Sequence, residues 1–291
     1  MSDGSNGALM TIGSVARATG IPANTIRTWE RRYGFPRPER TETGQRVYRT
    51  DVVRHLQLVS EALEAGHRPR QVLSMALNDL RALLTAAEPS SVVPEGMVPE
   101  SWKTAVKALS GESLEASMRQ DCARMGALRF IDDRVGPFLT WVGDEWHRGR
   151  LELHQEHFAS DTVRLVLDQT WRSLAPAVPA SVVCATLPGE LHDLGVHLAA
   201  VAVASGGRRP LVLPGETPVA DIVAAAAATA SVVVAISLSV HAGNRDYLPM
   251  LNELRARLPD DTQLWVGGGG APREVAGAVV SDDLARLADL V

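Results

Sequence analysis

The stretch Glu190-Leu191-His192-Asp193-Leu194-Gly195 decides the fold of the C-terminal part of the chain. It follows the short apolar run Ser181–Thr186 and precedes an apolar, helix-like segment at 196–204. A strand, a turn and a helix in this order place the turn at the carboxyl end of a sheet, where α/β folds bind ligands. His192 can reach from such a turn toward a bound group, and Gly195 lets something bulky come close. His192 could also be a surface histidine on an ordinary loop.

Two further turns with small residues come after predicted strands in the same region. Ser237-Leu238-Ser239 follows Val232–Ile236, and Gly267-Gly268-Gly269-Gly270 follows Leu264-Trp265-Val266. A deep ligand slot between strands and helices needs residues without bulk at such places. Together, the three turns favour a binding site over an ordinary loop.

Residues 177–291 alternate between strand-like and helix-like segments. This alternation predicts five parallel strands with crossover helices, a Rossmann-like sheet of the flavodoxin type. Gly-x-Gly-x-x-Gly is absent after the first strand, which disfavours a dinucleotide cofactor. The expected strands are Ser181–Thr186, Pro210–Leu213, Val232–Ile236, Gln263–Val266 and Ala278–Val280, and helices are expected from Leu191, Pro218, Asn244 and Pro272 and after Val280.

Length and composition limit the class of protein. The 291 residues suffice for two or three domains. Cys122 and Cys184 are far apart and form no metal-binding pair, which indicates a reduced, intracellular protein. Residues 1–7 are small and polar, so we expect no signal peptide, and no apolar run approaches membrane-spanning length.

The charge of the chain is unevenly distributed. The formal net charge is −5, but residues 1–75 hold eleven Arg against seven Asp and Glu, a net of +4 that leaves −9 for the rest. A basic head on an acidic body predicts that only the head meets an anionic partner.

The basic head has the pattern of short helices. Thr11 can cap a first helix, Gly20-Ile21-Pro22 makes a turn, and Asn24–Tyr33 forms a second helix, which is a helix-turn-helix arrangement. The prolines in Gly34–Pro38 prevent continuation. A small wing with a turn at Thr43-Gly44 and a helix over 51–65 are expected to follow.

Seven arginines and only three glutamates lie between residues 24 and 49. This excess predicts phosphate and groove contacts, with the second helix in the major groove and part of the wing on the DNA. A solvated basic face is the alternative, and Trp29 is expected in the core. The expected DNA-contacting residues are Thr25, Arg27, Arg31, Arg32, Tyr33, Arg46 and Tyr48.

A linker and a helical domain separate head and sheet. We expect the head to span 1–83, a proline- and serine-containing linker to span 84–100, and a four-helix bundle to span 101–176, before the sheet domain at 177–291. The expected helices are Trp102–Ser110, Ser113–Met125, Ala127–His147 and Gln155–Leu174.

The bundle contains Trp146-His147 and, after a fixed spacing, Glu156-His157. Three plain interpretations compete with a ligand site. Trp146 could be core, Glu156 and His157 could cap the fourth helix, and His154 with His147 and His157 could form a loose zinc site.

Two sequence patterns in the basic head resemble the MerR-type winged helix-turn-helix, in particular the B12-dependent CarH/LitR branch of light-responsive repressors. They are T-I-R-x-W-E-R-R-Y-G-F-P and G-Q-R-V-Y-R-T-D-V-V. The sheet domain resembles the cobalamin-binding domain that binds B12 base-off with histidine on cobalt. The resemblance lies in three patterns in its turns, E-x-H-x-x-G, S-L and G-G. The family usually has Asp where this chain has Glu190, a longer carboxylate that can still fix the imidazole tautomer. W-x9-E-H is similar to the family's helical cap.

The resemblance implies adenosylcobalamin as the cofactor and assigns roles to particular residues. His192 would be the lower cobalt ligand, and His147 the upper ligand after light. Trp146 would fill the space beside the adenosyl group, because burying it needs a flat aromatic wall and a few polar anchors. The implied cofactor-binding residues are Trp146, His147, Glu156, His157, Glu190, His192, Asp193, Gly195, Ser237, Leu238, Gly267 and Gly268.

The implied function is that of a cytoplasmic repressor without enzyme activity that binds operator DNA as a dark-state dimer or tetramer and releases it after photolysis. A corrinoid methyl-transfer protein and a MerR-type regulator that works without B12 remain as alternatives. A direct metal sensor is disfavoured, since MerR metal sensors use cysteines that this chain lacks near a dimerisation helix.

Overall fold

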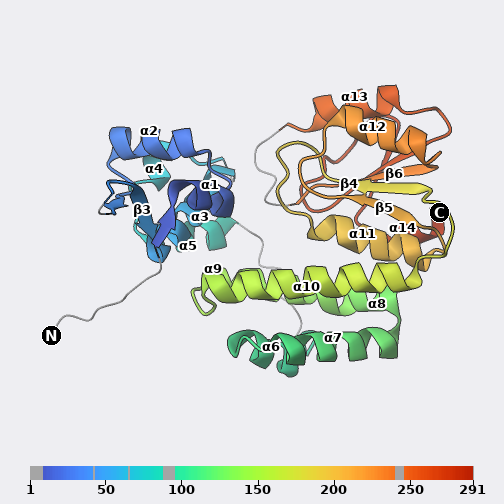
Figure 1. Ribbon diagram of the computed structural model, residues 1–291, viewed down its shortest axis with the longest axis horizontal. Helices are drawn as coiled ribbons and strands as arrows, with labels where there is room; N and C mark the ends of the chain where they lie inside the picture. Colours follow the sequence, from blue (N-terminus) through green and yellow to red (C-terminus); the bar gives the residue numbers. More distant parts are fainter. Residues whose placement is uncertain (1–8, 42, 65, 88–95, 240–245, 291) are drawn as a thin grey trace. The chain divides into compact units, whose positions relative to one another are not determined.

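The computed structural model describes residues 9–41, 43–64, 66–87, 96–239 and 246–290. The chain divides into two compact units, Met1–Ser90 and Ser91–Val291 (Figure 1). Residues 1–7, for which no signal peptide was expected, lie outside the described residues, as do residues 88–95 of the expected linker.

The first unit is a small antiparallel sheet with helices, as expected for a winged helix-turn-helix. The sheet order is β1-β3-β2, and the wing strands β2 and β3 pair through Glu39↔Val47 and Arg40↔Arg46. Its elements are β1 Leu9–Thr11, α1 Ile12–Thr19, α2 Ala23–Tyr33, β2 Glu39–Arg40, β3 Arg46–Arg49, α3 Thr50–Glu64, α4 Pro69–Val72 and α5 Leu77–Ala87.

Local signals set the ends of the first two helices. The Thr11 side chain accepts a hydrogen bond from Ser14 N, which confirms the expected cap. Gly20 and Gly34 end α1 and α2 with φ of 67° and 71°, a conformation that glycine adopts without strain. Helix α5 continues to Ala87, into the stretch expected to be linker, because Leu80 and Leu84 bury against the head.

The second unit begins with the helical bundle. The expected third helix contains one π-helical turn, and Pro137 gives the reason. Proline has no N–H to donate to the carbonyl of Asp133, and Arg134 Nη1 donates to that oxygen instead, at 3.2 Å. The helices are α6 Glu100–Lys107, α7 Gly111–Met125, α8 Ala127–Phe130, the π-turn Ile131–Val135, α9 Gly136–His147 and α10 Leu153–Leu174.

The rest of the second unit confirms the expected flavodoxin-type sheet. All neighbouring strands are parallel, in the order β5-β4-β6-β7-β8. The elements are β4 Val182–Ala185, α11 Leu194–Ser205, β5 Pro210–Leu213, α12 Val219–Ala228, β6 Val233–Ser237, α13 Leu248–Arg257, β7 Gln263–Gly267, β8 Ala278–Val280 and α14 Leu284–Leu290.

Helices cover both faces of this sheet. Helices α12 and α13 lie on one face, whereas α11 and α14 lie on the other (Figure 1). Helix α11 is apolar almost all round because it packs between the sheet and α10 of the bundle. The turn before α11 therefore lies at the carboxyl end of β4, beside the bundle.

Two expectations about helices are wrong. No helix starts at Pro272: backbone turns (Ala271 N to Gly268 O, Ala278 N to Val275 O) fill the short connection before β8, and Val275 is buried. Helix α11 starts at Leu194 rather than Leu191, since hydrogen bonds to Glu190 hold the preceding residues outside the helix. The start expected at Asn244 lies outside the described residues. Among the described helices, none is long and apolar enough to span a membrane.

Candidate functional sites

The turn after β4 is organised by one buried carboxylate. Glu190 is fully buried, and its Oε1 accepts hydrogen bonds from His192 N at 2.8 Å and from His192 Nδ1 at 3.0 Å. Its Oε2 accepts from Ser239 N at 2.8 Å, and the Ser239 hydroxyl lies 3.0 Å from the same oxygen. One carboxylate thus ties the turn after β4 to the turn after β6.

This network fixes the imidazole of His192. Burial alone would raise the pKa of Glu190, but the hydrogen bonds from His192 and Ser239 outweigh it and hold that pKa below its ordinary value. An ionised Glu190 accepts the proton on Nδ1 and leaves Nε2 as the nitrogen that can ligate a metal. The His192 side chain is 51% exposed, so a large group can reach it.

The glycines and the serine at the strand ends pack closely against each other. A Cβ on Gly195 would lie 2.1 Å from Ser237 Oγ, and one on Gly268, whose φ is 95°, would lie 2.3 Å from Leu238 O. A Cβ on Gly267 would lie 2.9 Å from a backbone oxygen. The fold itself therefore requires glycine at these positions, and their role toward a ligand stays a prediction.

The bundle presents Trp146 and His147 at the end of α9. Trp146 is 6% exposed, and its ring meets His147 edge to face at 5.0 Å. His147 Nδ1 lies 2.8 Å from the carbonyl of Gly143, one turn earlier. Donation from Nδ1 leaves Nε2 of His147 as the ligating nitrogen, as in His192.

An ion pair holds the turn between α9 and α10. Arg150 Nε donates to Glu145 Oε2 at 2.8 Å, and Arg150 Nη2 donates to the other oxygen. The hydrogen bond from Arg150 lowers the pKa of Glu145, which is only 9% exposed. This two-pronged contact fixes the path of the chain directly after His147.

Glu156 and His157 lie in the first turns of α10 and do not cap it. Glu152 and Gln155 form the capping box, so the cap interpretation is wrong. His157 Nδ1 lies 2.6 Å from Glu156 Oε2, and this hydrogen bond raises the pKa of His157.

The pKa of Glu156 is also affected by His192 in the turn after β4. Burial raises its pKa, but His157, Ser160 and the charge of His192 outweigh that effect and lower it. His192 is thus close enough to Glu156 for its charge to act on this carboxylate, across the space between α10 and the turn after β4.

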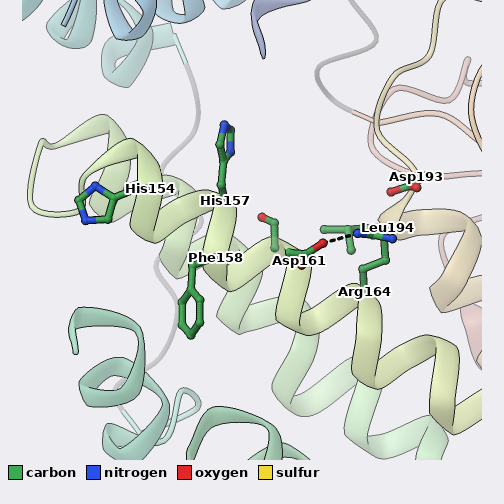
Figure 2. A pocket seen from close by; sticks show the side chains of 8 residues that line it. His154, His157, Phe158, Asp161, Arg164, Asp193 and Leu194 are labelled. Carbon is green, nitrogen blue, oxygen red and sulfur yellow. Dashed lines mark hydrogen bonds and ion pairs between the residues drawn. The ribbon is translucent and has the colours of Figure 1, made fainter. Parts of the chain in front are cut away.

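A cavity of about 530 Å³ adjoins this space, between α10 and the start of α11. Figure 2 shows Asp161 and Arg164 paired beside Leu194, with the carboxylate of Asp193 across from them. The residues that line the cavity are His154, His157, Phe158, Ser160, Asp161, Arg164, Asp193 and Leu194. Within the described part of the chain, no group of three or more His, Cys, Asp and Glu side chains is placed to hold a metal ion, which leaves the zinc interpretation without geometry.

The head displays its arginines on α2. Arg27, Arg31 and Arg32 are exposed, whereas Ile26 and Trp29 on the opposite side are buried. Arg27 Nη1 donates to Asn24, at 2.9 Å, along the exposed face. An exposed row of guanidinium groups on the second helix is the arrangement that reads a DNA groove.

The wing corrects one expected DNA contact. Tyr48 is 0% exposed, and its hydroxyl donates to Glu30. Burial, followed by the contact with Glu30, raises the pKa of Tyr48. A side chain without exposed surface cannot touch DNA in this conformation, so Tyr48 belongs to the core. Arg46 also pairs with Glu30, at 3.0 Å, but is 39% exposed and can still reach DNA. Thr25 and Tyr33 are partly exposed.

Sequence reasoning gave no role to Ser239, Glu145 or Arg150. Ser239 stands two residues after Ser237, but only the fold shows that it donates to Glu190. The spacing of Glu145 and Arg150 predicts no helical pair, because the ion pair forms across a turn.

Comparison with known proteins covers both units. The family model described as MerR HTH family regulatory protein matches residues 10–75, and the model described as B12 binding domain matches residues 100–170. The HTH-type transcriptional repressor CarA of Myxococcus xanthus is 30% identical over 275 residues, which cover 94% of this chain and 90% of CarA. The repressor CarH of the same organism is 28% identical over 268 residues, 89% of each chain.

Among solved structures, the monomethylamine corrinoid protein of Methanosarcina barkeri is similar with a TM-score of 0.50 and 17% identity. The match covers 65% of this chain and 94% of that protein. At this identity, the likeness shows the fold alone.

Proposed function

The chain belongs to the family of HTH-type transcriptional repressors that includes CarA and CarH, and from this premise we propose that it is a light-responsive repressor with adenosylcobalamin as its chromophore. The single observation that carries the cofactor proposal is the bond of His192 Nδ1 to buried Glu190, which leaves Nε2 as the nitrogen that can ligate a metal. An imidazole oriented in this way would hold a cobalt at the edge of the sheet domain.

The residues present fit cobalamin on two further grounds. Glu190 stays ionised below the ordinary pKa of a glutamate, so it keeps its acceptor role throughout the physiological range. The imidazole it holds is half exposed, at the edge of a site with a large cavity beside it. Gly195, Ser237, Leu238, Gly267 and Gly268 form the small-residue turns proposed to accommodate the nucleotide tail.

When bound, adenosylcobalamin supplies a cobalt–carbon bond that light can break. The protein supplies position and shelter. His192 would hold the metal, and Trp146, Glu156 and His157 would shelter the adenosyl group. His147, with Nδ1 fixed by Gly143 O, would offer Nε2 to the metal after light.

The head is proposed to bind operator DNA through the exposed arginines of α2 and through Arg46. Several heads linked in a dark-state dimer or tetramer would bind together, since multivalency raises affinity without new contacts. We expect the protein to act in the cytoplasm, where bacterial operator DNA lies, and to have no enzyme activity.

Two rival functions share this fold. A corrinoid methyl-transfer protein would use the same cap and sheet with methylcobalamin, but the MerR-type head has no place in that chemistry. A regulator that works without B12 would have the same DNA-binding head, but the hydrogen bonds of Glu190 would then orient His192 toward no ligand.

One experiment separates the three. The full chain is mixed with adenosylcobalamin in the dark, and its visible spectrum and its binding to DNA selected from a random-sequence pool are measured before and after green light. We expect a bound, His192-dependent spectrum and tight DNA binding in the dark, and after light a changed spectrum together with loss of DNA binding. A protein that stays colourless would support the B12-independent regulator, and methyl turnover with methylcobalamin would support the enzyme.

A further inference from the structure

The cavity beside α10 contains two charged residues, Asp161 and Arg164, that the proposed function does not use. Ser160, Asp161 and Arg164 follow His157 at helical spacing on α10, so they continue the face that carries the proposed cap residues. Asp193, across the cavity, is the neighbour of His192 in the chain. The cavity is thus next to the proposed cobalt site, since His157 lines it and Asp193 adjoins His192 in the chain.

The polar groups in this cavity are available to a ligand. Asp193 occupies the N-cap position of α11, but within the described residues its side chain makes no capping bond to that helix. Asp161 and Arg164 form an i,i+3 pair with side chains 70% and 46% exposed. An exposed pair of this kind contributes little stability, so both partners can exchange it for bonds to a ligand at low cost.

The mixture of charges selects the class of ligand. Two carboxylates accept hydrogen bonds, one guanidinium donates them, and the Ser160 hydroxyl, whose proton goes to Glu156, can accept one. An anion would meet two carboxylates, and a cation would meet Arg164. A neutral primary amide, which donates through its NH₂ and accepts through its oxygen, matches this set.

We propose that Asp161, Arg164 and Asp193 form a subsite that recognises the primary amide side chains on the corrin rim. This inference rests on the proposed function. Its consequence is specificity: hydrolysis of one rim amide to a carboxylate removes a donor and places a negative charge beside Asp161 and Asp193. The protein therefore discriminates between adenosylcobalamin and its monocarboxylate derivatives.

The test is a dark titration of the full chain with adenosylcobalamin and with each monocarboxylate derivative, followed by absorption. We expect wild type to bind at least one monocarboxylate about tenfold or more weakly, because like charges repel at close range. Arg164→Gln should weaken binding of adenosylcobalamin about fivefold or more, and Asp193→Asn should reduce the discrimination against that monocarboxylate. Arg172→Gln, which removes a similar exposed pair on the same helix outside the cavity, should change neither value.

The outcomes distinguish this inference from the proposed function. Equal affinity and equal discrimination in wild type, Arg164→Gln and Asp193→Asn would overturn the subsite while leaving the His192-dependent spectrum intact. Failure of wild type to bind adenosylcobalamin would overturn both. The ratio of the two affinities is internal to each protein, so a partly unfolded sample does not distort it, and circular dichroism confirms folding.

Discussion

Replacing Glu190 by glutamine tests the centre of the candidate site without any ligand. The substitution keeps the size of the side chain and removes its charge. Glutamine offers one oxygen and one NH₂ group, whereas the two carboxylate oxygens of Glu190 accept from His192 N and Ser239 N on opposite sides. At least one of these two backbone N–H groups must then face an NH₂ group.

The expected cost follows from burial. A hydrogen bond to a charged group contributes about 1.5–3 kcal/mol, and a buried donor left without its acceptor costs about 1–3 kcal/mol. These ranges describe overlapping effects, so we expect the free energy of unfolding to fall by about 2–4 kcal/mol. In a unit of this size, that loss lowers Tm by about 5–15 °C.

Thermal unfolding of the cofactor-free chain, followed by circular dichroism, measures this effect. His192→Ala is the matched control, since it removes a half-exposed ring and keeps the backbone N–H that Glu190 accepts. We expect the control to lose less, about 1–2 kcal/mol, because it removes the Nδ1 bond to Glu190 but keeps both backbone donors on the carboxylate. A difference of this size separates the role of the carboxylate in the fold from the role of the imidazole in ligation.

The pH dependence gives an independent check on the charge of Glu190. Its pKa is lower in the folded state than its ordinary value of 4.5, so unfolding takes up protons in acid. The stabilisation is complete above that ordinary value and disappears as the pH falls through the folded-state pKa. The difference in Tm between wild type and Glu190→Gln should therefore narrow on acidification below about pH 4.5. Equal melting temperatures at pH 7, or a difference that stays constant into acid, would refute the reasoning.

Five substitutions test the roles of individual residues in ligand binding, DNA binding and folding. His192→Ala should abolish the base-off spectrum with histidine on cobalt, and an unchanged absorption spectrum would count against the ligand. His147→Ala should leave DNA binding in the dark intact and alter the spectrum only after light; loss of dark binding would contradict its role. Arg27→Ala or Arg31→Ala should weaken DNA binding and lower its salt slope by about one, measured by titration at several salt concentrations, whereas an unchanged slope would move the DNA contact elsewhere. Tyr48→Phe should lower the Tm of the head through about 1–2 kcal/mol of lost hydrogen bonding and leave the salt slope unchanged; a lower slope would restore Tyr48 as a contact.

The order of the sheet could be predicted because its strands are short, apolar and bounded by turns. Pro210–Leu213 and Ala278–Val280 form strands at the expected residues. The helix expected from Pro272 is absent, since a helical composition does not show that only a short connection separates β7 from β8. Pro137 likewise lies inside a helix, which continues because a π-turn and Arg134 replace the missing hydrogen bond.

The contacts of the candidate site could be predicted only between residues that are close together in the sequence. His192 and Glu190 lie two positions apart on one turn, and their contact follows from that spacing. Tyr48 and Ser239 depend on partners 18 and 49 residues away, which no local pattern reveals. For this reason Tyr48 seemed a DNA contact, although Glu30 holds it in the core.

Helix α10 connects the candidate site to the rest of the second unit, and its first and second halves have different surroundings. Its first turns carry Glu156 and His157 beside an open cavity, whereas its later turns pack along α11, where Asp168 lies 4.0 Å from buried His197. Burial lowers the pKa of His197 although Asp193 and Asp168 oppose it, so the ring is neutral at pH 7 and the two groups form no ion pair. Apolar packing therefore holds the far half of α10, and such packing tolerates few intermediate positions.

Driving a two-state equilibrium from 1:99 to 99:1 requires about 5.5 kcal/mol of differential binding. Because burial of one large apolar side chain contributes about 1.5–3 kcal/mol, the proposed light switch would need a change in the burial of only two or three such groups.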